Sequence, residues 1–264
     1  KDIEIIISGS HSIISPNEPT LFRPAEIQSD IGRASWRRLL FEDGRNSIAL
    51  VLDDPSQSIT TKFHSEHEFW IVLEGEYECL IQEGSCSKVS KGDVIRFPSK
   101  TTSKVRAVSE TATRLVAYKL DHVGNGCYQG QRSSPAPDEF PDPAITRRSE
   151  MITMSQRRRK HTIISDDRNS VFLIKETPGT KSQGHWHFDF DEWWYLLMGE
   201  LDFSVGQNRP LINAIEGDVV YVPRGFKHQI TTVGGGSSIR MPVTNTDGVH
   251  IWTEKDDSAP PPRH

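Results

Sequence analysis

Cysteine is scarce in this chain of 264 residues, which contains only Cys79, Cys86 and Cys127. An odd number without the spacing of a metal site does not indicate a disulfide framework, so we expect reduced thiols. Cys79 and Cys86 nevertheless flank a predicted turn at Glu83-Gly84 and could face each other. No run approaches the roughly 20 apolar residues that span a bilayer, and we expect a soluble, cytoplasmic protein without a membrane partner. The chain begins at Lys1 rather than Met, and a leader removed before it stays an open alternative.

Positive charge is also in short supply, since the net charge is −5 with 35% hydrophobic and 25% charged residues. An acidic balance argues against binding driven by nucleic-acid phosphates. The concentrated basic run is Arg157-Arg158-Arg159-Lys160, which we interpret as a solvated segment rather than a binding patch. The expected partner is therefore a small molecule and not a nucleic acid, and a homodimer is an open alternative.

Convincing amphipathic helix is rare, although Pro24 to Leu40 permits a short one. Short apolar runs separated by Gly, Pro, Asn, Asp and Ser clusters are typical of an all-β protein instead. These runs are Ser47-Leu52, Trp70-Leu73, Val94-Phe97, Val171-Ile174 and Val219-Val222. Residues 124–150 are rich in proline and glycine and are predicted to form a linker. Residues 256–264, with three consecutive prolines, are predicted to be a flexible tail, and Lys1-Ile7 is predicted to be a strand.

Three histidines and a glutamate lie in two spaced segments of the second half of the chain. The segments are Gly179-(x5)-His185-Trp186-His187-(x4)-Glu192-(x6)-Gly199 and Gly217-(x5)-Pro223-Arg224-Gly225-(x2)-His228. Side chains alternate along a strand, so His185 and His187 share a face, and a turn would return Glu192 on a second strand beside them. Imidazole nitrogens with a carboxylate suit Fe, Mn, Ni, Cu or Zn. We predict that His185, His187, Glu192 and His228 bind one divalent transition metal.

The first half of the chain repeats patterns of the second half. Residues 68–76 (EFWIVLEGE) resemble residues 192–200 (EWWYLLMGE), and residues 92–98 (GDVIRFP) resemble residues 217–223 (GDVVYVP). Likewise, Arg45-Asn46-Ser47 corresponds to Arg168-Asn169-Ser170. Repetition at this length indicates duplicated domains rather than a solenoid, and the chain length also suits two domains.

The two metal-site segments resemble the two motifs of the cupin superfamily nearly position for position. This resemblance covers most of the chain and implies two tandem cupin barrels, which are double-stranded β-helices or jelly rolls. We place the N-terminal cupin at residues 1–123 and the C-terminal cupin at residues 151–255. The resemblance says little about the reaction, because cupin proteins differ widely in chemistry.

The two copies are not chemically equivalent. The aligned positions are His64 with His187, Glu68 with Glu192, Lys62 with His185, and Ser103 with His228. One imidazole and one carboxylate beside a lysine ammonium should bind a divalent cation weakly, and Lys62 and Glu68 could pair with each other instead. Glu66 and His67 are open as substitute ligands, but we interpret them as solvated turn residues. We therefore expect a degenerate N-terminal site and one metal ion per chain.

Four residues form the predicted substrate pocket around the metal. Strand parity places Gln183 on the face of the histidine pair, where it could hydrogen-bond a metal-bound oxygen or a water. Trp194 shares the face of the glutamate ligand, but we favour a core role because Trp70 occupies the same place in the degenerate copy. Tyr221 and Arg240 are expected to reach the cavity as well, although alternation could equally place Arg240 outside.

Three histidines and one glutamate leave two positions of a six-coordinate ion free for substrate. The resemblance extends to dioxygenases, oxalate-degrading enzymes, sugar isomerases and proteins that only bind ligands. The sequence places no second acid securely in the cavity to deliver a proton, which disfavours a decarboxylase or isomerase. Asp189 and Asp191 in the adjoining turn could serve, or could orient the imidazoles. We favour an Fe(II) dioxygenase acting on a small oxygen-chelating substrate. The alternatives are a non-oxidative lyase or isomerase with Mn, Ni or Zn, and a non-catalytic binding protein.

Overall fold

The computed structural model describes residues 16–31, 35–56, 60–81, 86–119 and 144–252. The predicted strand Lys1-Ile7, the predicted tail at 256–264, most of the predicted linker and Cys127 lie outside these ranges. Cys79 is buried and Cys86 is exposed, and both are free thiols.

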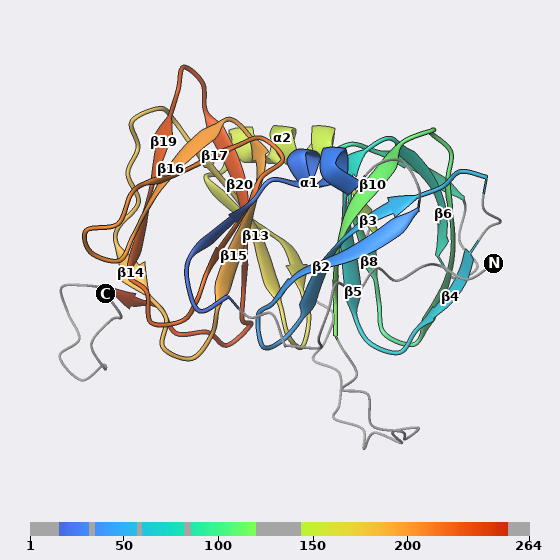
Figure 1. Cartoon of the computed structure of the whole chain (residues 1–264), viewed down its shortest axis with the longest axis horizontal. Helices are drawn as coiled ribbons and strands as arrows, with labels where there is room; N and C mark the ends of the chain where they lie inside the picture. Colours follow the sequence, from blue (N-terminus) through green and yellow to red (C-terminus); the bar gives the residue numbers. More distant parts are fainter. Residues whose placement is uncertain (1–15, 32–34, 57–59, 82–85, 120–143, 253–264) are drawn as a thin grey trace.

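Two β-barrels lie side by side, and the predicted all-β architecture of tandem jelly rolls is confirmed. Within the described residues, the helices are α1 (Pro24–Ile31) and α2 (Arg148–Arg157). Figure 1 shows both helices together at the edge between the barrels. Neither helix is long and apolar enough to cross a membrane.

The C-terminal barrel consists of a six-stranded and a five-stranded sheet. The larger sheet has the order β1 (Thr20–Phe22), β18 (Val219–Val222), β15 (Glu192–Met198), β20 (Ser238–Thr244), β13 (Ser170–Glu176) and β12 (Lys160–Ser165). The smaller sheet has the order β17 (Ile212–Ile215), β16 (Glu200–Val205), β19 (His228–Val233), β14 (His185–Trp186) and β21 (Ile251–Trp252).

The N-terminal barrel has the same plan with a six-stranded and a four-stranded sheet. Its larger sheet has the order β11 (Ile145–Thr146), β8 (Val94–Phe97), β5 (Glu68–Glu74), β10 (Ala112–Tyr118), β3 (Ser47–Asp53) and β2 (Trp36–Glu42). Its smaller sheet has the order β4 (Thr60–His64), β9 (Thr101–Ala107), β6 (Glu76–Ile81) and β7 (Ser87–Ser90).

Each barrel has an edge strand that comes from the segment preceding the other barrel in the sequence. Strand β1, which precedes all other strands of the N-terminal barrel, pairs antiparallel with β18 of the C-terminal barrel. In the opposite direction, β11 follows the N-terminal barrel and pairs with its strand β8. The end of the predicted linker therefore forms β11 and the start of α2. The two barrels are joined by this strand exchange as well as by packing.

The two six-stranded sheets face each other in the middle of the molecule, and one hydrophobic cluster spans both of them. Leu50 and Leu115 come from the N-terminal sheet, and Trp193, Tyr195 and Met241 come from the C-terminal sheet. Strands with two buried faces read as continuous apolar runs rather than alternating patterns. This explains the sequence EWWYLLM of β15, in which all but the last residue is buried. By contrast, β9 lies in an outer sheet and alternates between buried and exposed residues.

The repeated glycines Gly75 and Gly199 form equivalent turns, between β5 and β6 and between β15 and β16, where the chain crosses from one sheet to the other. Their φ angles are +73° and +87°, a region that side chains with a Cβ rarely adopt. A Cβ at Gly75 would lie 2.0 Å from the carbonyl oxygen of Thr111, and one at Gly199 would lie 2.8 Å from that of Ser237. Both positions therefore require glycine for conformation and for space, independently of any metal.

Candidate metal centre

The four predicted donors come together inside the C-terminal barrel. His185 lies on β14, His187 follows directly, Glu192 begins β15 and His228 begins β19. Their donor atoms all lie within 4.8 Å of one another. Strands β14 and β15 belong to opposite sheets, so residues 188–191 cross between the sheets instead of returning the chain on a strand beside the histidines, as we expected. The donors therefore converge from both walls of the barrel.

Backbone carbonyl groups fix the orientation of all three imidazoles. The Nδ1 atom of each ring lies near a carbonyl oxygen: His185 near Gln183 (3.2 Å), His187 near Val249 (3.0 Å) and His228 near Phe226 (3.1 Å). A carbonyl can only accept, so each Nδ1 carries a hydrogen and each Nε2 faces the centre of the site. Asp189 and Asp191 do not orient these rings, in contrast to one of our expectations. The three Nε2 atoms thus point towards one place, and once deprotonated they can present their lone pairs to a metal ion.

The donor atoms that face the centre of the site lie close together, and this arrangement favours a cation between them. Nε2 of His185 lies 3.2 Å from Nε2 of His228, and the Glu192 carboxylate lies 2.8 Å from Nε2 of His187 and 3.2 Å from that of His228. Burial raises the pKa of Glu192, but His187 and His228 outweigh burial and hold this pKa well below its ordinary value. Burial, together with the charge of His228, lowers the pKa of His185 to about 3. Burial lowers the pKa of His187, but Glu192 outweighs burial and raises it. An ionised carboxylate with three imidazoles that can release their Nε2 protons is a donor set that fits a divalent transition metal.

A cavity of about 530 Å³ opens beside this donor set. Of the predicted pocket residues, Gln183, Trp194 and Arg240 line it. Trp194 is also buried, and its ring packs at 5.2 Å from that of His228, so its core and lining roles coexist.

Tyr221 lies on the opposite face of its sheet and does not line this cavity, in contrast to our expectation. Its hydroxyl donates to Asp191 at 2.8 Å, and its ring packs against Phe41 of the other barrel at 4.7 Å. Strand β18 is buried on both faces, so alternation alone could not show which face meets the cavity.

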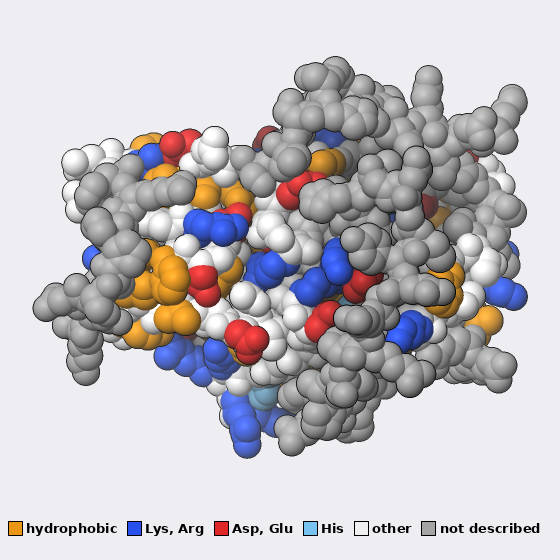
Figure 2. Space-filling model, turned by 90° about the horizontal axis from the view of Figure 1, so that it is seen from below, with side chains coloured by type: hydrophobic (Ala, Val, Ile, Leu, Met, Phe, Trp, Pro, Cys, Tyr) orange, Lys and Arg blue, Asp and Glu red, His pale blue; other side chains and the backbone are white. Residues whose placement is uncertain are grey.

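The further lining residues that the sequence did not reveal include Arg159, Lys160, His250 and Trp252. We interpreted the first two as part of a solvated basic run, and they are indeed exposed, but at the mouth of the cavity. His250 and Trp252 belong to the segment of β21, which reaches the site because Trp252 pairs with His185. Figure 2 shows hydrophobic side chains gathered at this barrel's end of the lower face. Long-range pairing places these residues, and no local pattern indicates it.

The cavity has an excess of positive charge. Arg240 is buried, with its guanidinium 3.8 Å from the Glu176 carboxylate, and Arg159 Nε donates to the same carboxylate at 2.7 Å. Lys160 lies over the ring of Phe172 at 3.7 Å and has no carboxylate partner in the described part of the chain. Burial lowers the pKa of Arg240 to about 10, so its guanidinium stays charged at neutral pH. Arg159 and Arg240 share one carboxylate and Lys160 adds a third positive charge, which favours an anionic ligand.

The equivalent place in the N-terminal barrel is filled by an ion pair. Lys62 pairs with Ser103 across β4 and β9, as His185 pairs with His228 across β14 and β19. The Lys62 ammonium contacts the Glu68 carboxylate, which confirms the expected pairing, and His64 Nε2 lies 2.8 Å from the Ser103 hydroxyl. The lysine thus supplies the positive charge that a metal would bring to this carboxylate.

We expect Lys62→Met to weaken the protein at neutral pH and to flatten its acid sensitivity. Burial raises the pKa of Glu68, but the neighbouring His64 imidazole and then the charge of Lys62 outweigh it and hold this pKa at about 2, below the ordinary 4.5. A depressed carboxyl pKa stabilises the fold above pH 4.5, and this stability is lost as the pH falls from 4.5 towards 2. Because Lys62 is partly exposed, the expected loss at pH 7 is about 1–2 kcal/mol.

Urea unfolding at a series of pH values measures this effect. Lys88→Met is the matched control, because it removes a lysine from an exposed pair with Glu76 and should cost at most about 0.5 kcal/mol. Equal stability losses and equal pH slopes in the two variants would contradict the role assigned to Lys62.

Comparison with known proteins supports this fold. Residues 49–119 match the family described as the cupin domain. The Cupin 2 conserved barrel domain protein from Leptotrichia buccalis is 11% identical, with 89% of this chain and 100% of that chain covered and a TM-score of 0.61. Bacillus subtilis oxalate decarboxylase, described with Mn(II) centres, is 17% identical, with 93% and 81% covered and a TM-score of 0.53. No curated protein matches the chain. The family match falls in the barrel that lacks the full donor set, and identities this low show the fold alone.

Proposed function

Because the chain has the cupin fold in two copies, we propose that its C-terminal barrel is a metal-dependent lyase that decarboxylates a small carboxylic acid without net oxidation. The observation that carries this proposal is the cationic cavity directly beside the His185, His187, Glu192 and His228 donor set. Manganese is the metal that we favour, in place of the Fe(II) favoured from the sequence.

The charged residues of the cavity suit a carboxylate substrate. Arg240 lies deep in the wall, whereas Arg159 and Lys160 lie at the mouth. Arginine binds carboxylates through two parallel hydrogen bonds, and a buried guanidinium that shares one carboxylate with Arg159 retains capacity for a second anion. A cavity of about 530 Å³ accommodates a small organic acid. We therefore infer that these cations hold one carboxylate of the substrate.

The donor set supplies the other half of the proposed site. A divalent ion held by the three imidazoles and Glu192 would provide positive charge beside a substrate oxygen. Trp194 lines the wall next to His228, and Phe172 and Trp252 add aromatic surface. These apolar side chains would orient the substrate and limit the access of water.

We favoured a dioxygenase because the sequence placed no proton donor securely in the cavity. The position of His250 weakens that argument. The ring of His250 lies 4.4 Å from that of His187 and 5.2 Å from that of His185, and it lines the cavity. Burial is the main cause that lowers its pKa, so this imidazole is neutral at pH 7 and can pass a proton. When the carbon–carbon bond of a carboxylate breaks, CO₂ leaves and the electron pair stays on the substrate carbon, which takes one proton. We infer that His250 delivers it from one ring nitrogen while the other ring nitrogen takes up a proton from water.

The proposed reaction can be tested by measuring CO₂ release, O₂ consumption and the incorporation of deuterium into the product. The Mn²⁺-loaded protein should be screened with small mono- and dicarboxylic acids in D₂O while CO₂ and dissolved O₂ are followed. We expect one CO₂ per product, deuterium on the product carbon, and no net O₂ consumption. Arg240→Met should reduce turnover by at least about tenfold if it binds the substrate carboxylate.

Other outcomes would support the alternatives. Consumption of one O₂ per product, together with a preference for Fe²⁺ over Mn²⁺, would restore the dioxygenase hypothesis. Saturable binding of an acid without any product would favour a non-catalytic binding protein. Both outcomes would overturn the decarboxylase proposal.

A further inference from the structure

The repeated Arg-Asn-Ser segments form two matching turns at the junction of the barrels. One turn joins β2 to β3, and the other joins β12 to β13. In the first turn, Asp43 Oδ1 accepts the amides of Arg45 (2.9 Å) and Asn46 (2.7 Å). In the second turn, Asp166 Oδ1 accepts those of Arg168 (2.9 Å) and Asn169 (2.7 Å). The local sequence therefore closes both turns in the same way.

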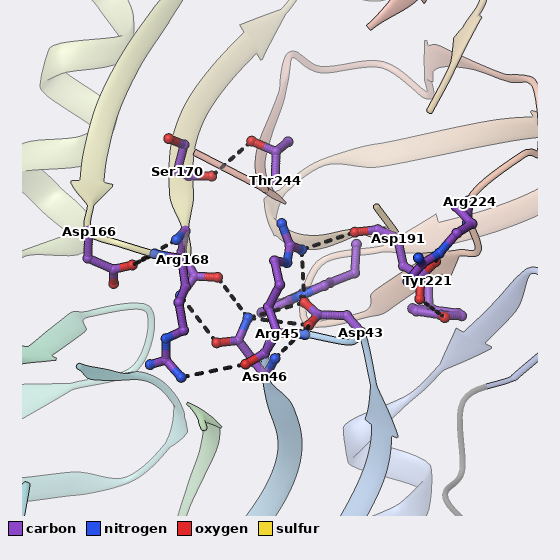
Figure 3. Close-up of polar contacts among 12 residues, drawn as sticks. Asp43, Arg45, Asn46, Asp166, Arg168, Ser170, Asp191, Tyr221, Arg224 and Thr244 are labelled. Carbon is purple, nitrogen blue, oxygen red and sulfur yellow. Dashed lines mark hydrogen bonds and ion pairs between the residues drawn. The ribbon is translucent and has the colours of Figure 1, made fainter. Parts of the chain in front are cut away.

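The two turns meet across the interface in a reciprocal amide pair. The Asn46 side chain donates to Asn169 Oδ1 at 2.7 Å, and the Asn169 side chain donates to Asn46 Oδ1 at 3.2 Å. Both asparagines are buried. Figure 3 shows the first turn, with Asp43, Arg45 and Asn46, beside Asp166 and Arg168 of the second. We call this pair of turns the interdomain clasp.

Each clasp arginine reaches into the other barrel. Arg45 Nη2 donates to the carbonyl oxygen of Asp191 at 3.0 Å, and Arg168 Nη2 donates to that of His67. Asp191 and His67 immediately precede Glu192 and Glu68, the equivalent carboxylates of the two barrels. The clasp therefore touches the metal-site segment of one barrel and the degenerate segment of the other at the same backbone position.

The clasp makes more hydrogen bonds to the metal-site segment than to the degenerate segment. Asp43 Oδ2 accepts the indole N–H of Trp193 at 3.0 Å, and Trp193 directly follows Glu192. The residue equivalent to Trp193 in the N-terminal barrel is Phe69, whose side chain has no donor. Both neighbours of Glu192 are thus bonded to the opposite barrel.

Further contacts extend from the clasp to the ligands. The Arg45 guanidinium lies over the ring of Phe190 at 5.5 Å, and that ring packs against His187 at 4.1 Å. The Asp191 carboxylate accepts the Tyr221 hydroxyl at 2.8 Å and the backbone amide of Arg224 at 2.8 Å, as Figure 3 shows. The segment that carries two donors is consequently fixed from both barrels.

We propose that Asp43 and Arg45 of the N-terminal barrel are positioning residues for Glu192 and His187, so that the degenerate barrel sets the metal affinity of the other. This proposal rests on the metal site of the proposed function but not on its reaction. Groups that orient metal ligands typically change metal affinity by 10–100-fold when they are removed. A structural role alone would affect stability and leave the affinity of the folded site unchanged.

The pseudo-symmetry of the clasp provides a matched control. Arg45→Met and Arg168→Met remove equivalent crossing hydrogen bonds, but only Arg45 touches the segment before Glu192. Mn²⁺ titration of the purified full chain and thermal unfolding of the metal-free protein are the two measurements. We expect similar losses of thermal stability in both variants, at least tenfold weaker Mn²⁺ binding in Arg45→Met, and wild-type affinity in Arg168→Met.

A milder variant keeps the test informative if Arg45→Met does not fold. Trp193→Phe reproduces the residue at the equivalent position, Phe69, and removes only the indole bond to Asp43. We expect a several-fold loss of Mn²⁺ affinity in this variant. Equal affinities in the wild type and all three variants would overturn the clasp proposal alone. A wild-type chain that binds no divalent metal would overturn the proposed function and the clasp proposal together.

Discussion

His187→Ala is expected to remove nearly all bound metal, whereas His64→Ala should leave the metal content nearly unchanged. His187 Nε2 lies 2.8 Å from the Glu192 carboxylate, and its Nδ1 is fixed by the Val249 carbonyl, so it is a preorganised ligand. Its loss should exceed the roughly 10–100-fold effect typical of groups that only orient ligands. His64 faces a serine and a lysine-paired glutamate, a set that should hold no ion of its own.

Metal content after Mn²⁺ loading and desalting measures this difference. We expect one equivalent per chain in the wild type and in His64→Ala, and close to none in His187→Ala. Two equivalents in the wild type, with one retained after His187→Ala, would show that the N-terminal barrel is not degenerate.

The second large expected effect is a gain of metal binding in the N-terminal barrel. The double variant Lys62→His with Ser103→His should bind a second metal ion, because it combines three imidazoles with the carboxylate of Glu68. Lys62 and Ser103 pair across β4 and β9 in the register that brings His185 and His228 together. The substitution also removes the ammonium that now neutralises Glu68.

Ser103→His alone is the control for this gain. It keeps the Lys62 ammonium beside the carboxylate, and we expect it to stay at one equivalent of Mn²⁺. If the double variant folded like the wild type and still bound one equivalent, the backbone of the N-terminal barrel, rather than its side chains, would prevent metal binding.

The fold and the donor set were accessible from the sequence because both depend on local spacing. Turn glycines such as Gly75 and Gly199, at positive φ, divide the chain into strands, and the donors lie in two short segments. The ion pair of Lys62 and Glu68 followed from aligning the two copies. These features need no knowledge of which strands become neighbours.

The rest of the site depends on contacts between distant segments. His250 and Trp252 reach the cavity through the pairing of β21 with β14, which no periodicity in the intervening residues indicates. Tyr221 belongs to a strand buried on both faces, where the interface with the other barrel competes with the cavity for each side chain. The sequence-based preference for an oxygenase rested on the lack of a securely placed proton donor, and only the tertiary structure brings His250 to the cavity.

Because β1 and β11 each pair with the sheet of the other barrel, neither barrel can be transplanted alone with all of its strands. A cut between the barrels would leave β18 without β1, because Thr20–Phe22 would remain with the other fragment. An uncovered strand edge presents free amide and carbonyl groups that recruit other chains and promote aggregation. Each barrel therefore depends on the segment that precedes the other barrel for one of its edge strands. Recombination between such proteins can exchange loops at the cavity mouth far more readily than complete barrels.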